Sequence, residues 1–209
     1  MHFITLNSNV ILYEPLNLET KKSEISKKAF IYVFNYVVLH FKIFQSMKLL
    51  IKPIENQFSN AIIDLILNIQ QKEFNVPITI EDQPDLLNIS NFYYSSGGGF
   101  WGAFIDDELV GTIALVKFAD HAAAIRKMFV KKAFRGKEFS IAQQLLETLI
   151  AYCKENQIDD LYLGTVSILE AALRFYEKND FVRIKKEELP VDFPLMAPDN
   201  VFCHLNVKK

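Results

Sequence analysis

The sequence predicts an α/β (α+β) fold in which helices flank a mixed central β-sheet. Three apolar stretches joined by short turns, within residues 100–130, indicate an antiparallel meander. Before and after the meander, in residues 56–74 and 140–156, apolar residues recur at helical spacing. After the second of these helices we expect a strand, a helix and two further strands. We therefore expect antiparallel and parallel strands in one sheet.

The composition is that of a folded chain with little net charge. Half of the 209 residues are hydrophobic, 13% are aromatic, and the formal net charge is −2. This richness in apolar residues excludes disorder throughout. The charge gives no general attraction for nucleic acid or an anionic membrane, so we expect no nucleic-acid partner. A site for an anion must therefore be local.

Residues 1–46 are predicted to form an N-terminal extension to a domain at 47–209, because a first strand, "KLLIKPI", follows Met47 directly. The role of this extension is open. Within it, "AFIYVFNYVVLHFKIF" (29–44) is strongly apolar. A spanning helix needs ~20 apolar residues, and polar residues interrupt this shorter run. The favoured interpretation is a helix or strand that packs on the domain, on a partner or in no fixed place, and membrane contact through 29–44 is the less favoured alternative.

The cysteines and histidines give no sign of a metal site. Cys153 and Cys203 lie far apart, without the spacing of metal ligands, and the four histidines are scattered. The chain shows no recognisable secretory signal, so we expect reduced, structural thiols and a cytoplasmic location. The sequence does not determine the oligomeric state and leaves a homodimer open.

The elements follow in order. After the first strand we expect a helix at 56–74 and a connecting segment with two prolines. The meander consists of strands at 100–105, 109–118 and about 125–130, with a turn at Asp106-Asp107. The helix at 140–156 begins with Ser140 as candidate N-cap and stops near Asn156. The remaining elements are a strand in 159–166, a helix in 168–179, a strand in 181–189 and a last strand in 199–209.

A basic loop precedes the helix at 140–156. In "FRGKEFSIAQQLL" (134–146), Arg135 and Lys137 flank Gly136 just before the helix starts. The first N–H groups of a helix lack partners, and its positive dipole end favours an anion. A phosphate group fits this position. An ordinary surface loop is the alternative, because such residues are common before helices.

The sequence resembles the GNAT superfamily of acetyl-CoA-dependent N-acetyltransferases. The resemblance rests on "IRKMFVKKAFRGKEFSIAQQLLETLIAYC" (125–153) and "AALRFYEKNDFVRI" (171–184). It implies a GNAT-like mixed sheet flanked by helices over residues 48–209. It also implies acetyl-CoA as co-substrate, without a metal ion.

The family's coenzyme motif is Arg or Gln, two residues, Gly, one residue, then Gly or Ala. The paired leucines Leu145 and Leu146 set its register, which places Lys137, Ser140 and Ala142 at the three diagnostic positions. Lysine lacks the planar guanidinium group of arginine. Serine lacks the backbone freedom of glycine, which matters if φ at position 140 is positive. The resemblance implies pantetheine pairing with a strand and diphosphate binding by the loop and helix start. The residues it implies for coenzyme binding are Met128, Phe129, Val130, Arg135, Gly136, Lys137, Glu138, Phe139, Ser140, Ile141 and Ala142.

By the same resemblance, Tyr176 in "RFYEKNDF" protonates the coenzyme A sulfur, and Asp180 replaces the usual glycine of that motif. A phenol is protonated at neutral pH and can donate its proton. Many family members carry a glutamate four residues before the position of Met128, where this chain has Ala124. Glu81, Asp82 or water are the alternatives for the base.

The expected function is transfer of an acetyl group from acetyl-CoA to the amine of a small molecule or amino acid. The alternative is an acyl-CoA-binding regulatory module without turnover, because two motif positions depart from the family pattern. The sequence does not determine the identity of the amine acceptor.

Overall fold

The computed structural model describes residues 48–208 together with Tyr32 and Asn35. Apart from these two residues, the extension expected at 1–46 lies outside the described residues, as does the apolar segment 29–44. The chain divides into two units, Met1–Met47 and Lys48–Lys209. Among the described residues, no helix has both the length and the apolar character needed to cross a membrane.

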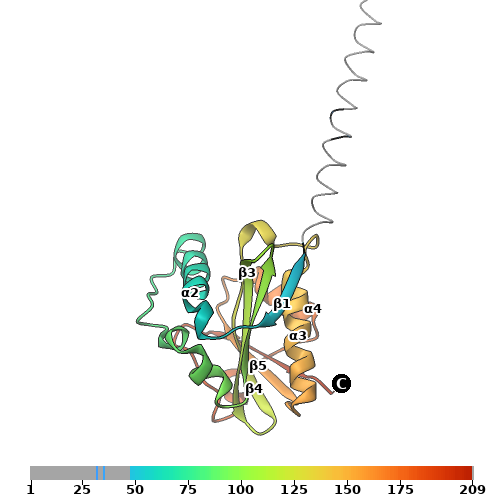
Figure 1. The fold of residues 1–209 in the computed structure, drawn as a ribbon. Coiled ribbons are helices and arrows are strands. Elements are labelled where there is room, and N and C mark those ends of the chain that lie inside the picture. The colour runs from blue at the N-terminus through green and yellow to red at the C-terminus, as the bar shows by residue number, and fades with distance from the viewer. Residues whose placement is uncertain (1–31, 33–34, 36–47, 209) are drawn as a thin grey trace, which may run out of the picture. The chain divides into compact units, whose positions relative to one another are not determined.

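A mixed sheet of seven strands forms the centre of the second unit, as the sequence predicts (Figure 1). Within the described residues the strands lie in the order β1-β2-β3-β4-β5-β7-β6. Neighbouring strands are antiparallel, except that β4 and β5 run parallel. The strands are β1 (Leu49–Pro53), β2 (Gly99–Ile105), β3 (Glu108–Ala119), β4 (Ala122–Val130), β5 (Asp160–Thr165), β6 (Val182–Ile184) and β7 (Val201–Asn206).

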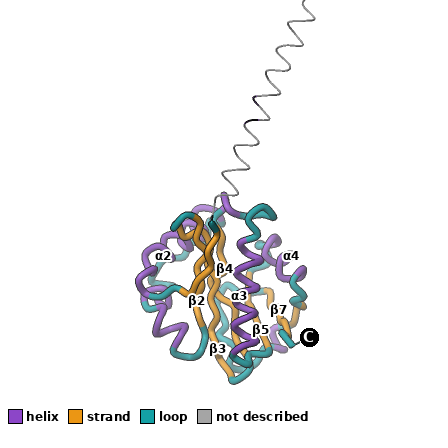
Figure 2. Tube along the Cα trace, turned by 45° about the vertical axis from the view of Figure 1, so that its right-hand side comes forward, coloured by secondary structure: helices purple, strands orange, loops and turns teal. Residues whose placement is uncertain are grey.

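Helices cover both faces of the sheet, with α2 on one side and α3 on the other (Figure 2). The buried face of α3 carries Ile141 and Leu145, whose methyl groups lie against Gly111 of β3. The helix ends at Asn156, where the sequence places its stop. The α-helices of the described part are α2 (Ser59–Leu67), α3 (Ile141–Glu155) and α4 (Glu170–Lys178).

Two predicted elements differ in detail from the structure. The helix predicted at 56–74 is one helical stretch that begins as a 3-10 helix, becomes α2 and ends as a π-helix, Asn68–Glu73. The strand predicted in 181–189 is limited to β6. The Glu188 carboxylate accepts a hydrogen bond from the Lys185 N–H at 2.7 Å, and the chain turns there into a short 3-10 helix. This local bond replaces the pairing that a longer strand would need.

The turn at Asp106-Asp107 joins β2 and β3 as predicted. Both residues have positive φ, 48° and 67°. Two consecutive residues with positive φ are typical of the hairpin turn that matches the twist of paired strands, and aspartate tolerates this conformation.

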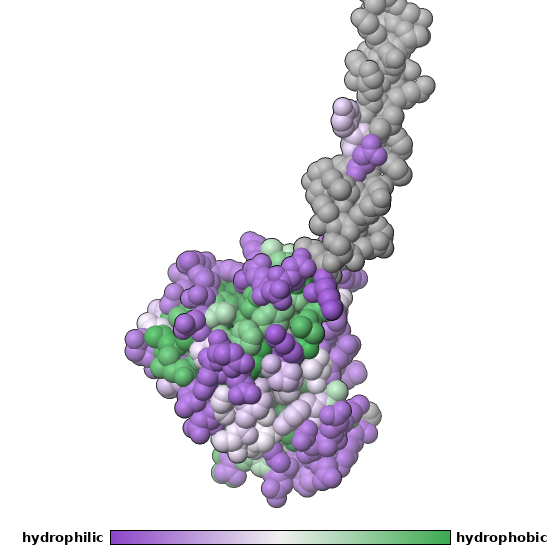
Figure 3. Space-filling model, viewed as in Figure 1, coloured by the Kyte–Doolittle hydropathy of each residue, from purple (hydrophilic) through white to green (hydrophobic). Residues whose placement is uncertain are grey.

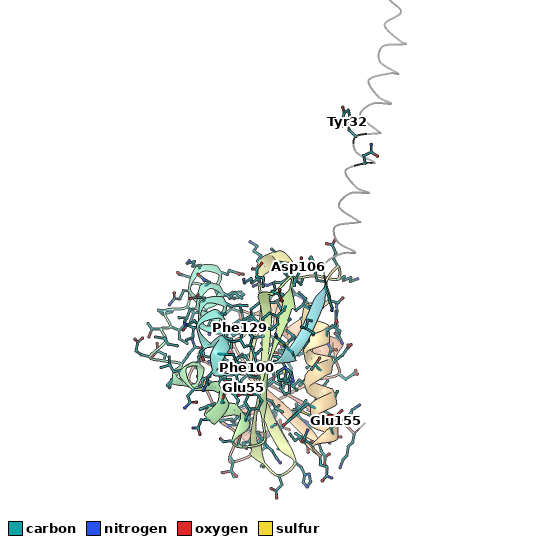
Figure 4. All side chains as sticks on the ribbon, in the orientation of Figure 1. Tyr32, Glu55, Phe100, Asp106, Phe129 and Glu155 are labelled. Atoms are coloured by element: carbon teal, nitrogen blue, oxygen red, sulfur yellow. The ribbon has the colours of Figure 1, made fainter. Side chains whose placement is uncertain are left out.

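Strand β2 is buried along its whole length because helices cover both of its faces. The ring centroids of Phe100 and Tyr93 lie 5.0 Å apart. Those of Trp101, the next residue, and Tyr152 of α3 lie 5.1 Å apart. Successive residues of a strand point to opposite faces, so the two aromatic rings enter two separate cores. Figure 4 shows Phe100 near the middle of the sheet, Asp106 at the turn between β2 and β3, and Glu155 at the end of α3. Figure 3 shows hydrophobic residues, ringed by hydrophilic ones, on the face that carries α2 and β1.

Strands β4 and β5 pair along only a short part of their length. The pairing joins Ala122–Ala124 to Asp160–Tyr162 and goes no further. Beyond it, β4 contains an irregularity at Lys127, whose φ is 50°, where its register with β3 shifts. The Thr112 hydroxyl donates a hydrogen bond of 2.7 Å to the Lys127 carbonyl and fixes this bulge. The last residues of β4 therefore keep β3 on one edge and have no β5 partner on the other.

The Lys127 side chain is held in a buried polar cluster. Its ammonium lies 3.1 Å from an Asp85 carboxylate oxygen and donates a hydrogen bond of 2.6 Å to Gln83. Tyr93 donates its hydroxyl hydrogen to the same carboxylate. Burial lowers the pKa of Lys127, and Asp85 opposes this effect. A buried charge needs such partners, because an unpaired one is strongly destabilising.

Replacing Asp85 with alanine should lower the free energy of unfolding by about 3 kcal/mol, because it leaves the Lys127 ammonium buried without a counter-charge. A double variant that also carries Lys127→Met should lose less than the sum of the two single losses. Urea unfolding of the four proteins measures this coupling. Glu108→Ala is the control, because the Glu108–Lys131 pair is largely exposed and should contribute under about 1 kcal/mol. Equal losses for Asp85→Ala and Glu108→Ala would contradict the argument.

Candidate active site

Two adjoining cavities lie where β4 has separated from β5. The first, here called the β5 cavity, has a volume of about 240 Å³ and lies between β4, the end of β5 and residues 196–199. The second, the α3 cavity, has a volume of about 410 Å³ and lies between β4, the start of α3 and α4. Met128, Phe129 and Tyr176 are among the residues that line both cavities. A molecule bound in one cavity can therefore meet a molecule bound in the other.

The end of β4 offers backbone groups to the α3 cavity. Phe129 and Val130 pair with Thr112 and Gly111 of β3 on one edge, while β5 pairs only as far as Ala124. A strand edge of this kind can bind an extended ligand as an added strand would. The pantetheine arm of coenzyme A is such a ligand, and Met128, Phe129 and Val130 are the residues predicted to pair with it.

The loop before α3 supplies N–H groups at the other end of the same cavity. The helical hydrogen bonds begin with the Gln144 N–H, which donates to the Ser140 carbonyl at 3.0 Å. The N–H groups of Ile141, Ala142 and Gln143 therefore lie ahead of the helical ladder. Their position at the positive end of the α3 dipole suits a diphosphate. We therefore take these N–H groups and the free edge of β4 as the candidate site for coenzyme A.

The structure brings together five of the predicted coenzyme residues, which line the α3 cavity with Tyr176: Met128, Phe129, Val130, Arg135 and Ala142. Gly136, Lys137, Glu138, Phe139 and Ser140 form the loop ahead of α3. The Ile141 side chain has another role, because it is 1% exposed and packs in the core. Only the backbone of Ile141 is placed to meet a ligand.

Arg135 is tied into the fold more closely than its position in a loop suggests. Its Nε donates a hydrogen bond of 2.7 Å to the Val130 carbonyl, and its Nη1 lies 2.7 Å from a Glu73 carboxylate oxygen. Glu73 therefore balances part of the Arg135 charge. Lys137 is exposed two residues further on.

Ser140 occupies the N-cap position of α3, but its side chain does not cap the helix. Its φ is 50° and its ψ 27°, which is the left-handed conformation. The Ser140 hydroxyl donates a hydrogen bond of 2.9 Å back to the Lys137 carbonyl. A residue with a Cβ is strained in this conformation, whereas glycine is not. The φ at position 140 of the coenzyme motif is therefore positive, and serine is more strained at this position than glycine would be.

Ser140→Val should lower the free energy of unfolding by about 1–2 kcal/mol, because a β-branched side chain is poorly tolerated at positive φ. Ser140→Gly should leave it unchanged or raise it by less than about 1 kcal/mol. Thr148→Val serves as the control, because Thr148 lies within α3, where φ is negative. Thermal or urea unfolding compares the three variants, and similar losses from valine at both sites would contradict the strain.

Tyr176 lies on α4 at the junction of the two cavities. It is 7% exposed, and its hydroxyl donates a hydrogen bond of 3.1 Å to the Met128 sulfur. Its ring packs on Phe175 and Phe181. Burial raises the pKa of Tyr176 far above its ordinary value of 10.0, so the hydroxyl remains a proton donor throughout the physiological pH range. Asp180, which follows α4, has a φ of 65° and preserves the turn in which the family has glycine.

The two carboxylates considered as bases lie elsewhere. Neither Glu81 nor Asp82 lines the two cavities, and Asp82 accepts a hydrogen bond from the Thr79 N–H. Ala124 is fully buried. Sequence reasoning missed the charged residues that do line the β5 cavity, Arg126, Lys127 and Asp199. Asp199 belongs to no motif, and only the pairing of β7 with β5 brings it here.

No metal site is found within the described residues, where no group of three or more His, Cys, Asp or Glu side chains could hold an ion. Cys153 and Cys203 are both buried and free of disulfides. Burial raises the pKa of Cys153 to about 12, which keeps it an unreactive thiol. Both cysteines thus lie where the expected packing role places them.

Comparison with known proteins shows the family to which the chain belongs. Residues 63–181, more than half of the chain, match the Acetyltransferase (GNAT) family. A GNAT-family acetyltransferase from Staphylococcus aureus Mu50 is 40% identical, with a TM-score of 0.73 over 77% of this chain and 99% of that one. An acetyltransferase from Streptococcus agalactiae 2603 is 28% identical, with a TM-score of 0.72 over 76% and 98%. PaiA N-acetyltransferase from Thermoplasma acidophilum, solved in complex with coenzyme A, shares the fold at 18% identity and a TM-score of 0.59, over 77% and 99%.

Similarity to curated proteins covers a shorter part of the chain. An N-acetylaspartate synthetase from Danio rerio is 31% identical over 106 residues, which are 50% of this chain and 37% of that protein. The "Probable N-acetyltransferase camello" from Xenopus tropicalis is 29% identical over 109 residues, 51% of this chain and 49% of that protein. The chain thus spans half or less of the length of these relatives.

Proposed function

Because the chain belongs to the GNAT family of acetyltransferases, we propose that it transfers an acetyl group from acetyl-CoA to the amine of a small molecule or amino acid. The observation that carries this proposal is the position of Tyr176, which lines both cavities and directs a buried, protonated hydroxyl at the Met128 sulfur. A proton donor at such a junction is what a leaving thiolate requires.

The α3 cavity is proposed to hold the coenzyme. The backbone of Met128, Phe129 and Val130 would pair with the pantetheine arm, and the loop 135–142 would bind the diphosphate. Acetyl-CoA supplies the activated thioester. The chain would contribute orientation and the proton donor, since residues of β4, α4 and the helical stretch 56–73 line the cavity.

The β5 cavity is proposed to hold the amine acceptor. Its volume of about 240 Å³ suits a small molecule rather than a folded protein. The name of one relative, N-acetylaspartate synthetase, refers to the acetylated amine of an amino acid, which supports an acceptor of that size. We propose the cytoplasm as the location of this reaction. The proposed mechanism needs only one chain and is the same for a monomer and a homodimer.

Tyr176→Phe should lower turnover about tenfold or more while leaving the affinity for coenzyme A nearly unchanged, because phenylalanine keeps the ring packing and removes only the proton donor. Release of free thiol from acetyl-CoA over a panel of amino acids, polyamines and peptides measures turnover. Calorimetry with coenzyme A measures affinity.

Tyr152→Phe is the matched control, because the Tyr152 hydroxyl bonds to the Gly97 and Gly98 carbonyls and lines neither cavity. It should leave turnover intact. Equal turnover of wild type and Tyr176→Phe would remove Tyr176 from its role. Coenzyme A binding without thiol release on any amine would instead favour an acyl-CoA-binding module.

A further inference from the structure

Asp199 is fixed beside the end of β5 by backbone hydrogen bonds around it. Its N–H donates to the Met196 carbonyl at 3.1 Å, and the N–H of the next residue, Asn200, donates to the Thr165 carbonyl at 2.9 Å. The Asn200 side chain in turn accepts a hydrogen bond of 2.8 Å from the Ser167 N–H. These hydrogen bonds fix the backbone around Asp199, which lines the β5 cavity together with Tyr176 of α4.

The Asp199 carboxylate lies where a side chain at position 164 would be, and this space is free because residue 164 is glycine. A Cβ on Gly164 of β5 would lie 2.1 Å from an Asp199 carboxylate oxygen, so any other residue at position 164 would displace the carboxylate. Asp199 takes part in no ion pair with another described residue. Burial raises the pKa of Asp199, and the positive charge of Arg126 opposes this effect.

Arg126 brings a positive charge to the same cavity. It lies on β4 beside Lys127 and donates a hydrogen bond to the Pro194 carbonyl. The neighbouring ammonium of Lys127 is neutralised by Asp85 at 3.1 Å, whereas within the described residues no carboxylate forms an ion pair with Arg126. The β5 cavity thus carries one negative and one positive side chain that are not paired with each other. A partly buried charge of this kind is stabilised when a ligand of opposite charge binds.

We propose that the acceptor is an α-amino acid or a similar zwitterion, whose ammonium is bound and deprotonated by Asp199 and whose carboxylate is bound by Arg126. This inference rests on the proposed acetyl transfer. It adds the proton acceptor and the recognition of a carboxylate. A guanidinium suits this task because its planar donors can hold a carboxylate at two points.

One N–H bond of the ammonium breaks, the proton goes to the Asp199 carboxylate, and the electron pair stays on nitrogen. The neutral nitrogen forms the bond to the acetyl carbon, the carbon–sulfur bond breaks, and the sulfur takes the Tyr176 hydroxyl proton. The surplus proton on nitrogen restores Tyr176, and Asp199 releases its proton to water. The products are the N-acetyl amino acid, the free thiol and one proton.

Asp199 accepts a proton only when it is ionised, so the rate should fall as the pH drops through its raised pKa. The other charged or titratable side chains that line the cavity are Arg126 and Lys127 on β4 and Tyr176 on α4. A guanidinium is not deprotonated in proteins, the Asp85 carboxylate favours the charged form of Lys127, and burial raises the pKa of Tyr176, so its phenol is neutral in acid. The acid limb of the rate profile therefore belongs to Asp199 or to the acceptor itself, and a variant separates the two.

The test compares wild type, Asp199→Asn and Arg126→Gln on matched acceptors. One set of acceptors is the twenty protein amino acids. The matched set is the decarboxylated analogues of phenylalanine, histidine and alanine, which are phenethylamine, histamine and ethylamine. Thiol release gives kcat and KM as a function of pH. Calorimetry on protein saturated with coenzyme A gives the Kd of each acceptor without turnover. Asp192→Asn is the control, because Asp192 is exposed and lies outside the β5 cavity.

Wild type should prefer an amino acid to its matched amine. Arg126→Gln should raise both KM and Kd of the amino acid about tenfold or more while changing those of the amine less than about twofold. Asp199→Asn should lower kcat about a hundredfold and abolish the acid limb, with the Kd of coenzyme A unchanged.

Three results would overturn the inference: amines used as well as amino acids, no amino acid acetylated, or an acid limb and turnover that survive in Asp199→Asn. A wild type that does not bind coenzyme A would overturn the proposed function itself. A wild type that binds coenzyme A and acetylates amines without regard to a carboxylate would overturn only the acceptor assignment.

Discussion

The separation of β4 from β5 is the constraint on which the rest of the site depends. Two parallel strands that stayed paired would satisfy each other's backbone groups and leave no cavity between them. Here the pairing stops at Ala124, and the bulge at Lys127 turns the rest of β4 away. The bond from Thr112 to the Lys127 carbonyl and the buried ion pair with Asp85 hold that bulge from both sides. The same few contacts therefore stabilise the fold and keep both cavities open.

Much of the fold could be predicted from the sequence, because its signals are local. The Asp106-Asp107 turn and the helical spacing that ends at Asn156 are each decided within a few residues. The length of β6 was mispredicted for a local reason too, since Glu188 bonds to the Lys185 N–H and ends the strand. Tyr176 is a candidate from the sequence because it lies in a recognisable motif, and it lines both cavities.

The parts that could not be predicted depend on residues far apart in the sequence. Lys127 looks like an exposed strand lysine until Asp85, 42 positions earlier, is seen beside it at 3.1 Å. Arg135 looks like a free cation until Glu73 is seen to lie 2.7 Å away. Asp199 enters the cavity because β7 pairs with β5 and because Gly164 has no side chain. The charge of a site is therefore decided by tertiary contacts that no local pattern contains.

Coenzyme A is proposed to lie between the free edge of β4 and the head of α3. Titration of the isotope-labelled full chain with coenzyme A, followed through its backbone amide signals, tests this most directly. The largest shifts should occur at Met128–Val130 and Arg135–Ala142, with small shifts at the far end of α3 near Glu155. Shifts spread evenly over the chain, or confined to the β2–β3 turn at Asp106, would contradict it.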